Sequence, residues 1–412
     1  MASITERKNG TFRIAVSNGR DINGKQIIET TTFKFDDTKT KRQNEKALEK
    51  FVIEFETRVK EGKLLSGEKL TLKKYTDTWL KDYAGKQYEL TTIEQTTEHL
   101  NKIILPCLGH YKLAEIKPLH IQGLYDTLLS NGYNASSIRR YHNIISSMLN
   151  TAVYWQLIEN NPCSRVKPPK LERNTDVKHF TLEEAQAFLE YIEEPYQSKH
   201  GGRGEKMLEA MDERKEPLQL KALFNLAIYG GFRRGELLAL TWNDIDFEKC
   251  VIDINKSLAK TKSAGAIIKT TKNKSSDRLV SVPEECIRLL KEVRAEQRVN
   301  QFASGESWQG KGNVFYQADG SYMAVSTPSH SLQRIIKRYN KEHEEQLPLI
   351  PFHGLRHTSA TLLISQNNDI KTVSARLGHA DVSTTLDIYT HALKKRDEEA
   401  SKTLEILFKK QA

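Results

Sequence analysis

Two charged residues, Arg233 and Glu236, lie one helical turn apart within the stretch GGFRRGELLAL at residues 230–240. The apolar residues that follow predict a helix, and Arg233 would stand at its N-terminus. A helix N-terminus attracts anions, and an arginine adds a forked donor that suits phosphate oxygens. Taken alone, the pattern fits a helix-capping ion pair better than a phosphate site.

Two lysines, Lys272 and Lys274, lie near the middle of a second pattern, IIKTTKNKSSDRLVSVP, at residues 267–283. The strand-like runs on either side predict a β-hairpin with a basic tip. Lys272 or Lys274 would then project into a cleft that holds a phosphodiester, where a lysine can donate a proton to a departing alkoxide. A solvated hairpin with no catalytic role is the simpler interpretation of this pattern by itself.

A histidine and an arginine, His353 and Arg356, lie three positions apart in PFHGLRHTSATLLIS at residues 351–365. On a helix they share one face, and both donate hydrogen bonds of the kind that a phosphoryl group accepts. The small residues Thr358, Ser359 and Ala360 would let this face approach another segment of backbone. The alternative is a purely structural pair.

The last pattern, LGHADVSTTLDIYTHAL at residues 377–393, places His379 and Tyr389 on either side of a run of small polar residues. A surface turn followed by a core-facing helix would explain such a stretch. The functional hypothesis is that Tyr389 is a nucleophile and that His379 positions its target.

Together the four patterns describe a phosphoryl transfer that needs no metal. A tyrosine oxygen would attack a phosphodiester, arginines and histidines would neutralise the pentacoordinate transition state, and a lysine would protonate the departing 5′ oxygen. A metal-assisted route would need clustered carboxylates, and none stands out in the sequence. We therefore expect neither a metal nor another cofactor.

The composition is that of a basic folded protein, with 412 residues, 63 Lys and Arg against 53 Asp and Glu, and a net charge of +10. This excess favours a polyanionic partner such as nucleic acid, although net charge alone fits a merely basic protein as well. The scattered cysteines predict reduced thiols rather than disulfides or a zinc site. Neither a bilayer-spanning apolar run nor a signal-peptide core is present, so we expect a cytoplasmic protein without a membrane partner.

The first 170 residues predict two structural regions. Alternating residues over 11–35 predict a small antiparallel sheet, and residues 36–62 predict a helix that completes a minidomain. From residue 70 to about 166, apolar spacings of three and four predict a bundle of four or five helices. Arg139 and Arg140 open its last long helix and are candidates for phosphate contact, or for a solvated helix N-terminus. Prolines in the VKPPK segment that follows predict a linker.

A further domain begins at HFTLEEAQAFLEYI, where Thr181 and Glu184 have capping-box spacing. The polar and charged residues 194–216 predict a mobile surface insertion. The rest predicts a mixed but mostly helical domain with a small sheet. Its expected elements are a helix at 218–240, strands around 250–282, a helix at 284–299 and a helical remainder from 326 onward.

The ordered set GGFRRGELLAL, TKNKSSDRLVSVP, HGLRHTSATLL and LGHADVSTTLDIYTH resembles the tyrosine recombinase family. The likeness is strongest to integrases of temperate phages and conjugative transposons of Gram-positive bacteria. It implies a multidomain, mainly α fold with small β elements. The expected parts are an arm-type DNA-binding domain at 1–65 (a three-stranded sheet plus helix), a helical core-binding, SAM-like domain at 70–167, and a mixed α+β catalytic domain at 175–412 with a C-terminal docking helix.

The resemblance also implies an activity and its residues. The expected enzyme is a site-specific DNA recombinase that integrates and excises a mobile element through a 3′-phosphotyrosyl intermediate, without ATP or metal. Glu236 matches the structural partner of the first arginine, and Lys274 stays open as an alternative lysine or a DNA contact. The positions that match the catalytic set are Arg233, Lys272, His353, Arg356, His379 and the nucleophile Tyr389.

The partners that the resemblance implies are double-stranded DNA, at core-type and arm-type sites, and further copies of the chain in a homo-tetramer on two DNA sites. An excisionase and a host DNA-bending protein are open as further partners. Three alternatives use the same fold or chemistry. They are a dimer-resolving recombinase, which usually lacks the arm-type domain, a type IB topoisomerase, and a catalytically silent DNA-binding regulator.

Overall fold

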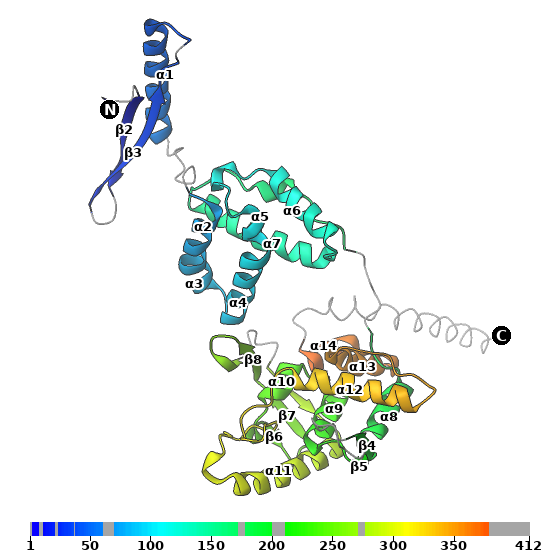
Figure 1. Cartoon of the computed structure of the whole chain (residues 1–412). Coiled ribbons are helices and arrows are strands. Elements are labelled where there is room, and N and C mark those ends of the chain that lie inside the picture. The colour runs from blue at the N-terminus through cyan, green and yellow to red at the C-terminus, as the bar shows by residue number, and fades with distance from the viewer. Residues whose placement is uncertain are drawn as a thin grey trace, which may run out of the picture. The chain divides into compact units, whose positions relative to one another are not determined.

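The computed structural model describes residues 2–7, 11–20, 24–36, 38–60, 70–171, 178–199, 211–270 and 277–378. The chain divides into two compact units, Met1–Glu172 and Arg173–Ala412 (Figure 1). Both units are mainly helical and carry small antiparallel sheets, which confirms the predicted fold class. Within the described ranges, no helix is long and apolar enough to cross a membrane.

The N-terminal sheet has three antiparallel strands in the order β1-β2-β3, with bounds Ser3–Glu6, Thr11–Arg20 and Gln26–Lys34. Helix α1, Lys41–Lys60, packs Phe55 and Val59 against Ile14 and Val16 of β2. The predicted sheet and helix are confirmed, but β1 precedes the range expected from the sequence. All four of its residues are exposed, so it carries no alternation of buried and exposed positions that a sequence pattern can detect.

Four long helical stretches form the second part of the first unit. Two of them contain a π-helical turn, over Leu80–Ala84 and Leu100–Ile104. In chain order the stretches are α2 to α3 (Leu72–Trp79 and Gly85–Gln87), α4 to α5 (Leu90–His99 and Leu105–Leu108), α6 (Pro118–Ser130) and α7 (Ala135–Tyr154).

Large aromatic side chains tie these helices together, and each finds a partner for its polar atom. The Tyr75 hydroxyl donates to the Met148 carbonyl at 2.8 Å, and the Trp79 indole donates to the Thr151 hydroxyl at 3.1 Å. Both rings are fully buried. Buried tyrosine and tryptophan need such partners, so these bonds fix how α2 packs on α7.

The second unit is built around α9, Leu218–Gly230, which is buried along almost its whole length. In the described part of this unit, α8, α11, α12 and α13 pack on it, and α14 packs on α13. Their bounds are α8 Leu182–Tyr191, α11 Glu284–Ser304, α12 Thr327–Glu342, α13 Phe352–Ser365 and α14 Ile370–Leu377. The predicted capping box is present, because Glu184 N donates to Thr181 Oγ1 and Thr181 N donates to Glu184 Oε2.

The prediction of one helix over 218–240 is wrong. Helix α9 ends at Gly230, and the short helix α10, Arg234–Ala239, begins after a break. Gly231 adopts the left-handed conformation, with φ of 63°, and Arg233 is extended. Apolar spacing continues across the break, so periodicity alone joined the two helices. The break is what separates Arg233 from the buried run of α9.

The predicted hairpin between residues 267 and 283 is also wrong. Strand β9, Gly265–Thr270, pairs with β8, Lys256–Thr261, while β10, Arg278–Ser281, pairs with β7, Val251–Ile254. Strand β6, Ile245–Asp246, completes the sheet of β10 and β7. A tight turn with Gly265 at φ of 68° joins β8 to β9, so β9 pairs with the strand before it rather than the strand after it.

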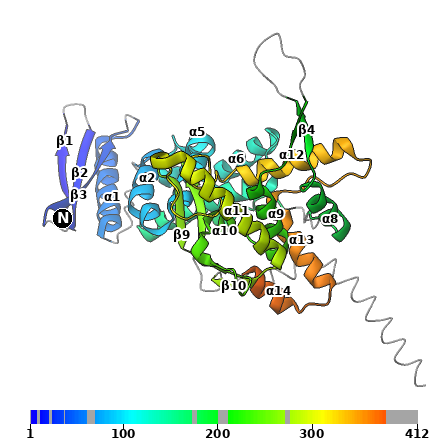
Figure 2. The ribbon, with the colours of Figure 1, turned by 90° about the horizontal axis from the view of Figure 1, so that it is seen from below.

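The ends of the predicted insertion at 194–216 are ordered strands, so the prediction is wrong there. Strands β4, Tyr196–Lys199, and β5, Met211–Arg214, form an antiparallel pair beside α12 (Figure 2). Just after β5, Glu216 is buried between Arg334 at 2.7 Å and Arg338 at 2.9 Å. This charge pairing anchors the base of the insertion on α12.

Candidate active site

The break between α9 and α10 puts Arg233 at the N-cap of α10. A Cβ atom at Gly231 would lie 2.6 Å from Leu377 Cδ2. Helix α14 therefore packs so close to the break that only glycine fits at position 231. About a third of the Arg233 side chain (36%) stays exposed. Arg233 therefore lies at the surface of the unit, and the backbone just before it packs against α14.

Glu236 is almost fully buried and receives hydrogen bonds from two arginines. Arg233 donates to it from its backbone N at 2.9 Å and from Nη1 at 2.7 Å. Arg278 donates through Nη2 at 2.9 Å and through Nη1 at 3.2 Å. Burial would raise the pKa of Glu236, but the bonds and charges of Arg278 and Arg233 outweigh it and hold the pKa below its ordinary value. Glu236 is therefore an ionised carboxylate at neutral pH.

Arg356 and His353 both lie on α13, as their spacing predicts. Arg356 is 1% exposed, and it donates to the Gly231 carbonyl at 2.8 Å and to the Leu377 carbonyl at 2.5 Å. The face of α13 that carries the small residues packs close to another segment of backbone, as predicted, because Phe180 N donates to the Thr358 hydroxyl. Arg356 thus spans from the α9–α10 break to the end of α14.

His353 reaches the surface of the unit, with its ring centroid 4.7 Å from that of His357. Partial desolvation and the positive charges of Arg356 and Arg233 lower the pKa of His353. The imidazole is therefore mostly neutral at pH 7. It can offer a hydrogen bond to a phosphate oxygen, whereas positive charge in this region comes from the arginines.

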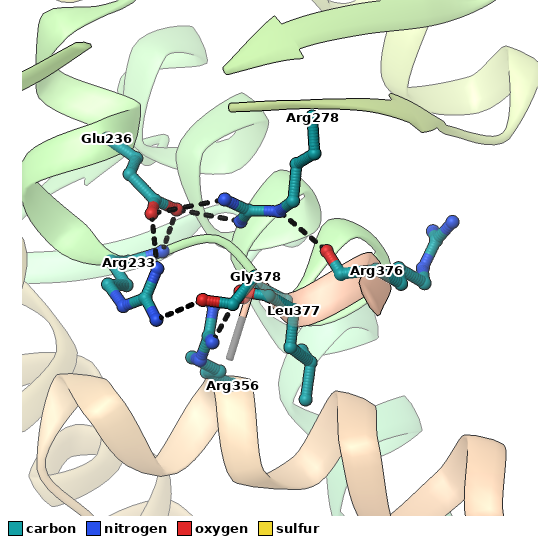
Figure 3. Close-up of polar contacts among 8 residues, drawn as sticks. Arg233, Glu236, Arg278, Arg356, Arg376, Leu377 and Gly378 are labelled. Carbon is teal, nitrogen blue, oxygen red and sulfur yellow. Dashed lines mark hydrogen bonds and ion pairs between the residues drawn. The ribbon is translucent and has the colours of Figure 1, made fainter. Parts of the chain in front are cut away.

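Three consecutive carbonyls at the end of α14 each accept a hydrogen bond from a different arginine (Figure 3). Arg278 Nε donates to the Arg376 carbonyl at 2.6 Å, Arg356 Nη2 to the Leu377 carbonyl, and Arg233 Nη2 to the Gly378 carbonyl at 2.8 Å. The last carbonyls of a helix lack intrahelical partners and carry the negative end of its dipole. The guanidinium groups satisfy both needs, and they gather at the residue that precedes His379.

Arg278 and Arg376 belong to this cluster, and sequence reasoning missed both. Arg376 donates to the carbonyls of Tyr229 and Ser281, each at 2.9 Å, so α14 is tied back to α9 and β10. A signal for Arg278 was present in the sequence. It shares one face of β10 with the buried Val280, and a charged residue on the buried face of a strand needs a partner.

The remaining predicted site residues are distributed as follows. Lys272, Lys274, His379 and Tyr389 lie outside the described residues. Arg139 is half-buried and donates to the Pro169 carbonyl at 3.3 Å, which joins α7 to the VKPPK segment. Arg140 is exposed and lines a cavity of about 280 Å³ in the helical bundle. Over the part of the chain that the structure describes, no group of three or more His, Cys, Asp or Glu could hold a metal ion.

Two family models match the chain. The model of the phage integrase family matches residues 203–396, and that of the phage integrase N-terminal SAM-like domain matches residues 71–129. A tyrosine recombinase XerC-like protein of Caldanaerobacter subterraneus subsp. tengcongensis is 30% identical over 420 residues, covering 97% of this chain and 98% of that protein. The ICEBs1 integrase of Bacillus subtilis is 29% identical over 311 residues, covering 75% and 76%.

Solved structures share the fold. The Tn1549 transposon integrase, in complex with a circular intermediate DNA, aligns with a TM-score of 0.60 at 20% identity, over 80% of this chain and 99% of that one. A lambda integrase dimer bound to a core site aligns with a TM-score of 0.53 at 17% identity, over 93% and 94%. The chain therefore belongs to the tyrosine recombinase family of phage integrases. It is a site-specific DNA recombinase of the kind that mobile elements carry.

Proposed function

We propose that this recombinase integrates and excises a mobile element by cutting DNA with Tyr389 and rejoining it through a 3′-phosphotyrosyl intermediate. The observation that carries the proposal is the convergence of Arg233 and Arg356, from different helices, on the carbonyls of Leu377 and Gly378. The chain continues from Gly378 directly into His379. Two guanidinium groups at this point supply the charge that a pentacoordinate phosphate needs.

In the proposed reaction the Tyr389 hydroxyl loses its proton to solvent, its oxygen attacks the scissile phosphorus, and the 5′ oxygen departs with a proton from Lys272. Arg233, whose side chain is partly exposed, contacts the nonbridging oxygens, and His353 and His379 add hydrogen bonds. Arg356, which is buried, adds positive charge from below the surface of the site. The phosphotyrosine keeps the energy of the broken bond, so a 5′ hydroxyl of another strand can reverse the step and no ATP is consumed.

The proposed division of labour assigns arm-site binding to residues 1–65, core-site binding to 70–167, and catalysis to 175–412. Among the described residues, separate hydrophobic clusters support this division, with one cluster in each of the first two ranges and two in the third. Arg139, Arg140 and Lys274 are proposed DNA contacts, with Arg139 acting also as a link to the following segment. We place the reaction in the cytoplasm, on two DNA sites held by a homo-tetramer, with an excisionase and a host bending protein as candidate helpers.

The test is a metal-free incubation of the full-length chain with a nicked duplex that spans the recombination site, taken from the junctions of its element. Wild type should give a denaturant-resistant protein–DNA adduct, and Tyr389→Phe should give none. Tyr322→Phe in the same unit is the matched control and should keep the adduct. An adduct that survives in Tyr389→Phe would exclude this nucleophile.

Absence of any adduct, with binding to a verified site intact, would instead support a catalytically silent regulator. The two lysines are separated in the same assay. Lys272→Ala should react slowly with a normal 5′ oxygen leaving group, while Lys274→Ala should weaken DNA binding and cleave normally once bound. A 5′-thiol leaving group, which departs without a proton, should restore the Lys272 variant.

A further inference from the structure

We propose that Arg278 is a positioning residue for strand cleavage, which holds Glu236, and through it Arg233, in register with the end of α14. This inference rests on the proposed function, because it assigns a role in the same reaction. The Arg278 side chain is 6% exposed, whereas Arg233 is partly open to solvent. Arg278 therefore acts behind Arg233 rather than on the DNA.

The first step of the argument is how fully Glu236 is engaged. Each of its carboxylate oxygens accepts one bond from Arg233 and one from Arg278. Arg233 is bound through both its backbone and its guanidinium, which fixes the direction of its side chain. Removing Arg278 would leave Glu236 with one partner and room to rotate, and Arg233 would rotate with it.

The second step is the link to α14. Arg278 uses its two terminal nitrogens for Glu236 and its Nε for the Arg376 carbonyl, so one planar group joins α10 to the end of α14 (Figure 3). Arg376 in turn donates to the Ser281 carbonyl at the end of β10, which gives a second bond between α14 and β10. A lysine cannot reproduce this, because its single nitrogen cannot span a carboxylate and a carbonyl in fixed geometry.

The third step is a comparison within the same unit. Glu216 is also buried between two arginines, Arg334 and Arg338, so the chemistry of its pairing is like that of Glu236. That triad joins the segment after β5 to α12, and within the described residues its hydrogen bonds do not extend to Arg233, Arg356 or α14. Changes to this triad therefore report the contribution of a buried Glu–Arg pairing to stability alone, because the triad is not linked to the site.

Misplacement of a catalytic group by about 1 Å can cost a factor of about 100 in rate. We expect Arg278→Lys to slow single-turnover cleavage by about 100-fold, and Arg278→Gln by at least as much. The affinity for DNA should change by less than about threefold, since the substituted side chain is buried away from the surface that binds phosphate.

The experiment measures adduct formation by the full-length protein at saturating nicked DNA, with affinity and melting temperature measured in parallel. Arg338→Lys is the matched control, and it should lower the melting temperature while cleaving at the wild-type rate. Arg233→Lys and the double variant Arg233→Lys/Arg278→Lys complete a cycle. If Arg278 acts through Arg233, the double variant should be about as slow as Arg233→Lys alone.

Five results would overturn the inference. Wild-type cleavage by Arg278→Lys, or effects of the two arginines that multiply in the double variant, would show that Arg278 does not act through Arg233. Equal slowing by Arg338→Lys would point to general loss of stability. Failure of both Arg278 variants to fold, while Arg338→Lys folds, would make Arg278 a residue of the fold. Absence of an adduct from wild type would refute the proposed function itself, and this inference with it.

Discussion

Replacing Gly231 with alanine should destabilise the second unit far more than the same change at another left-handed glycine. Gly231 has φ of 63°, and a Cβ there would lie 2.6 Å from Leu377 Cδ2 and 3.2 Å from Ser359 Oγ. Leu377 is fully buried, so its methyl group has nowhere to move without shifting α14. Gly265 has φ of 68° and nothing within 4 Å of the same added atom.

The two glycines separate a backbone cost from a packing cost. An L residue in the left-handed region costs about 1 to 2 kcal/mol, and this is the whole effect expected for Gly265→Ala. At Gly231 the overpacked methyl adds about 1 to 3 kcal/mol. We therefore expect Gly231→Ala to exceed Gly265→Ala in loss of unfolding free energy by about 1 to 3 kcal/mol.

Urea unfolding of the two full-length variants, compared with wild type, measures this difference. Cleavage of the nicked substrate gives a second readout, because Leu377 carries the carbonyl to which Arg356 donates. Gly231→Ala should cleave more slowly at saturating DNA, and Gly265→Ala should not. Equal destabilisation by the two changes would refute the close approach of α14 to the α9–α10 break.

Three further outcomes are expected. Because the pKa of Glu236 is lowered from its ordinary value of 4.5, its ionised form stabilises the fold above that pH, and this contribution is lost as the pH falls below it. The gap in melting temperature between wild type and Glu236→Gln should thus be widest near neutral pH and narrow in acid; a constant gap would contradict the ionised assignment. Tyr75→Phe should cost about 0.5 to 1.5 kcal/mol in urea unfolding, because it removes the hydrogen bond from the Tyr75 hydroxyl to the Met148 carbonyl, which keeps its helical donor within α7, and an unchanged midpoint would argue against a contribution from that bond. DNA affinity should fall steeply and linearly on a log–log plot against salt concentration, since phosphate contacts release counterions, and a salt-independent affinity would count against the basic surface as the contact.

Local patterns in the sequence were enough to predict the helical bundle, the capping box at Thr181 and the placement of His353 and Arg356 on one helix. Each depends on residues within a few positions of one another, and helical periodicity makes such neighbours share a face. The ordered motifs likewise identified the family, because they specify the types of side chain that the chemistry needs.

Contacts between distant segments decided the rest. Helix α9 ends at a left-handed Gly231, where α14 leaves no room for a side chain, and no periodicity within 218–240 records that neighbour. Strand β9 had a possible partner on each side, and the turn at Gly265 selected β8.

The arginine cluster is the clearest case. Arg278 lies 42 positions from Glu236 and 98 from Arg376, yet one guanidinium contacts both. A sequence states that these charges exist, and only the packing of β10 and α14 against α10 makes them partners. The sequence therefore predicted the residue types of the site, whereas only the tertiary structure determines the contacts that orient Arg233.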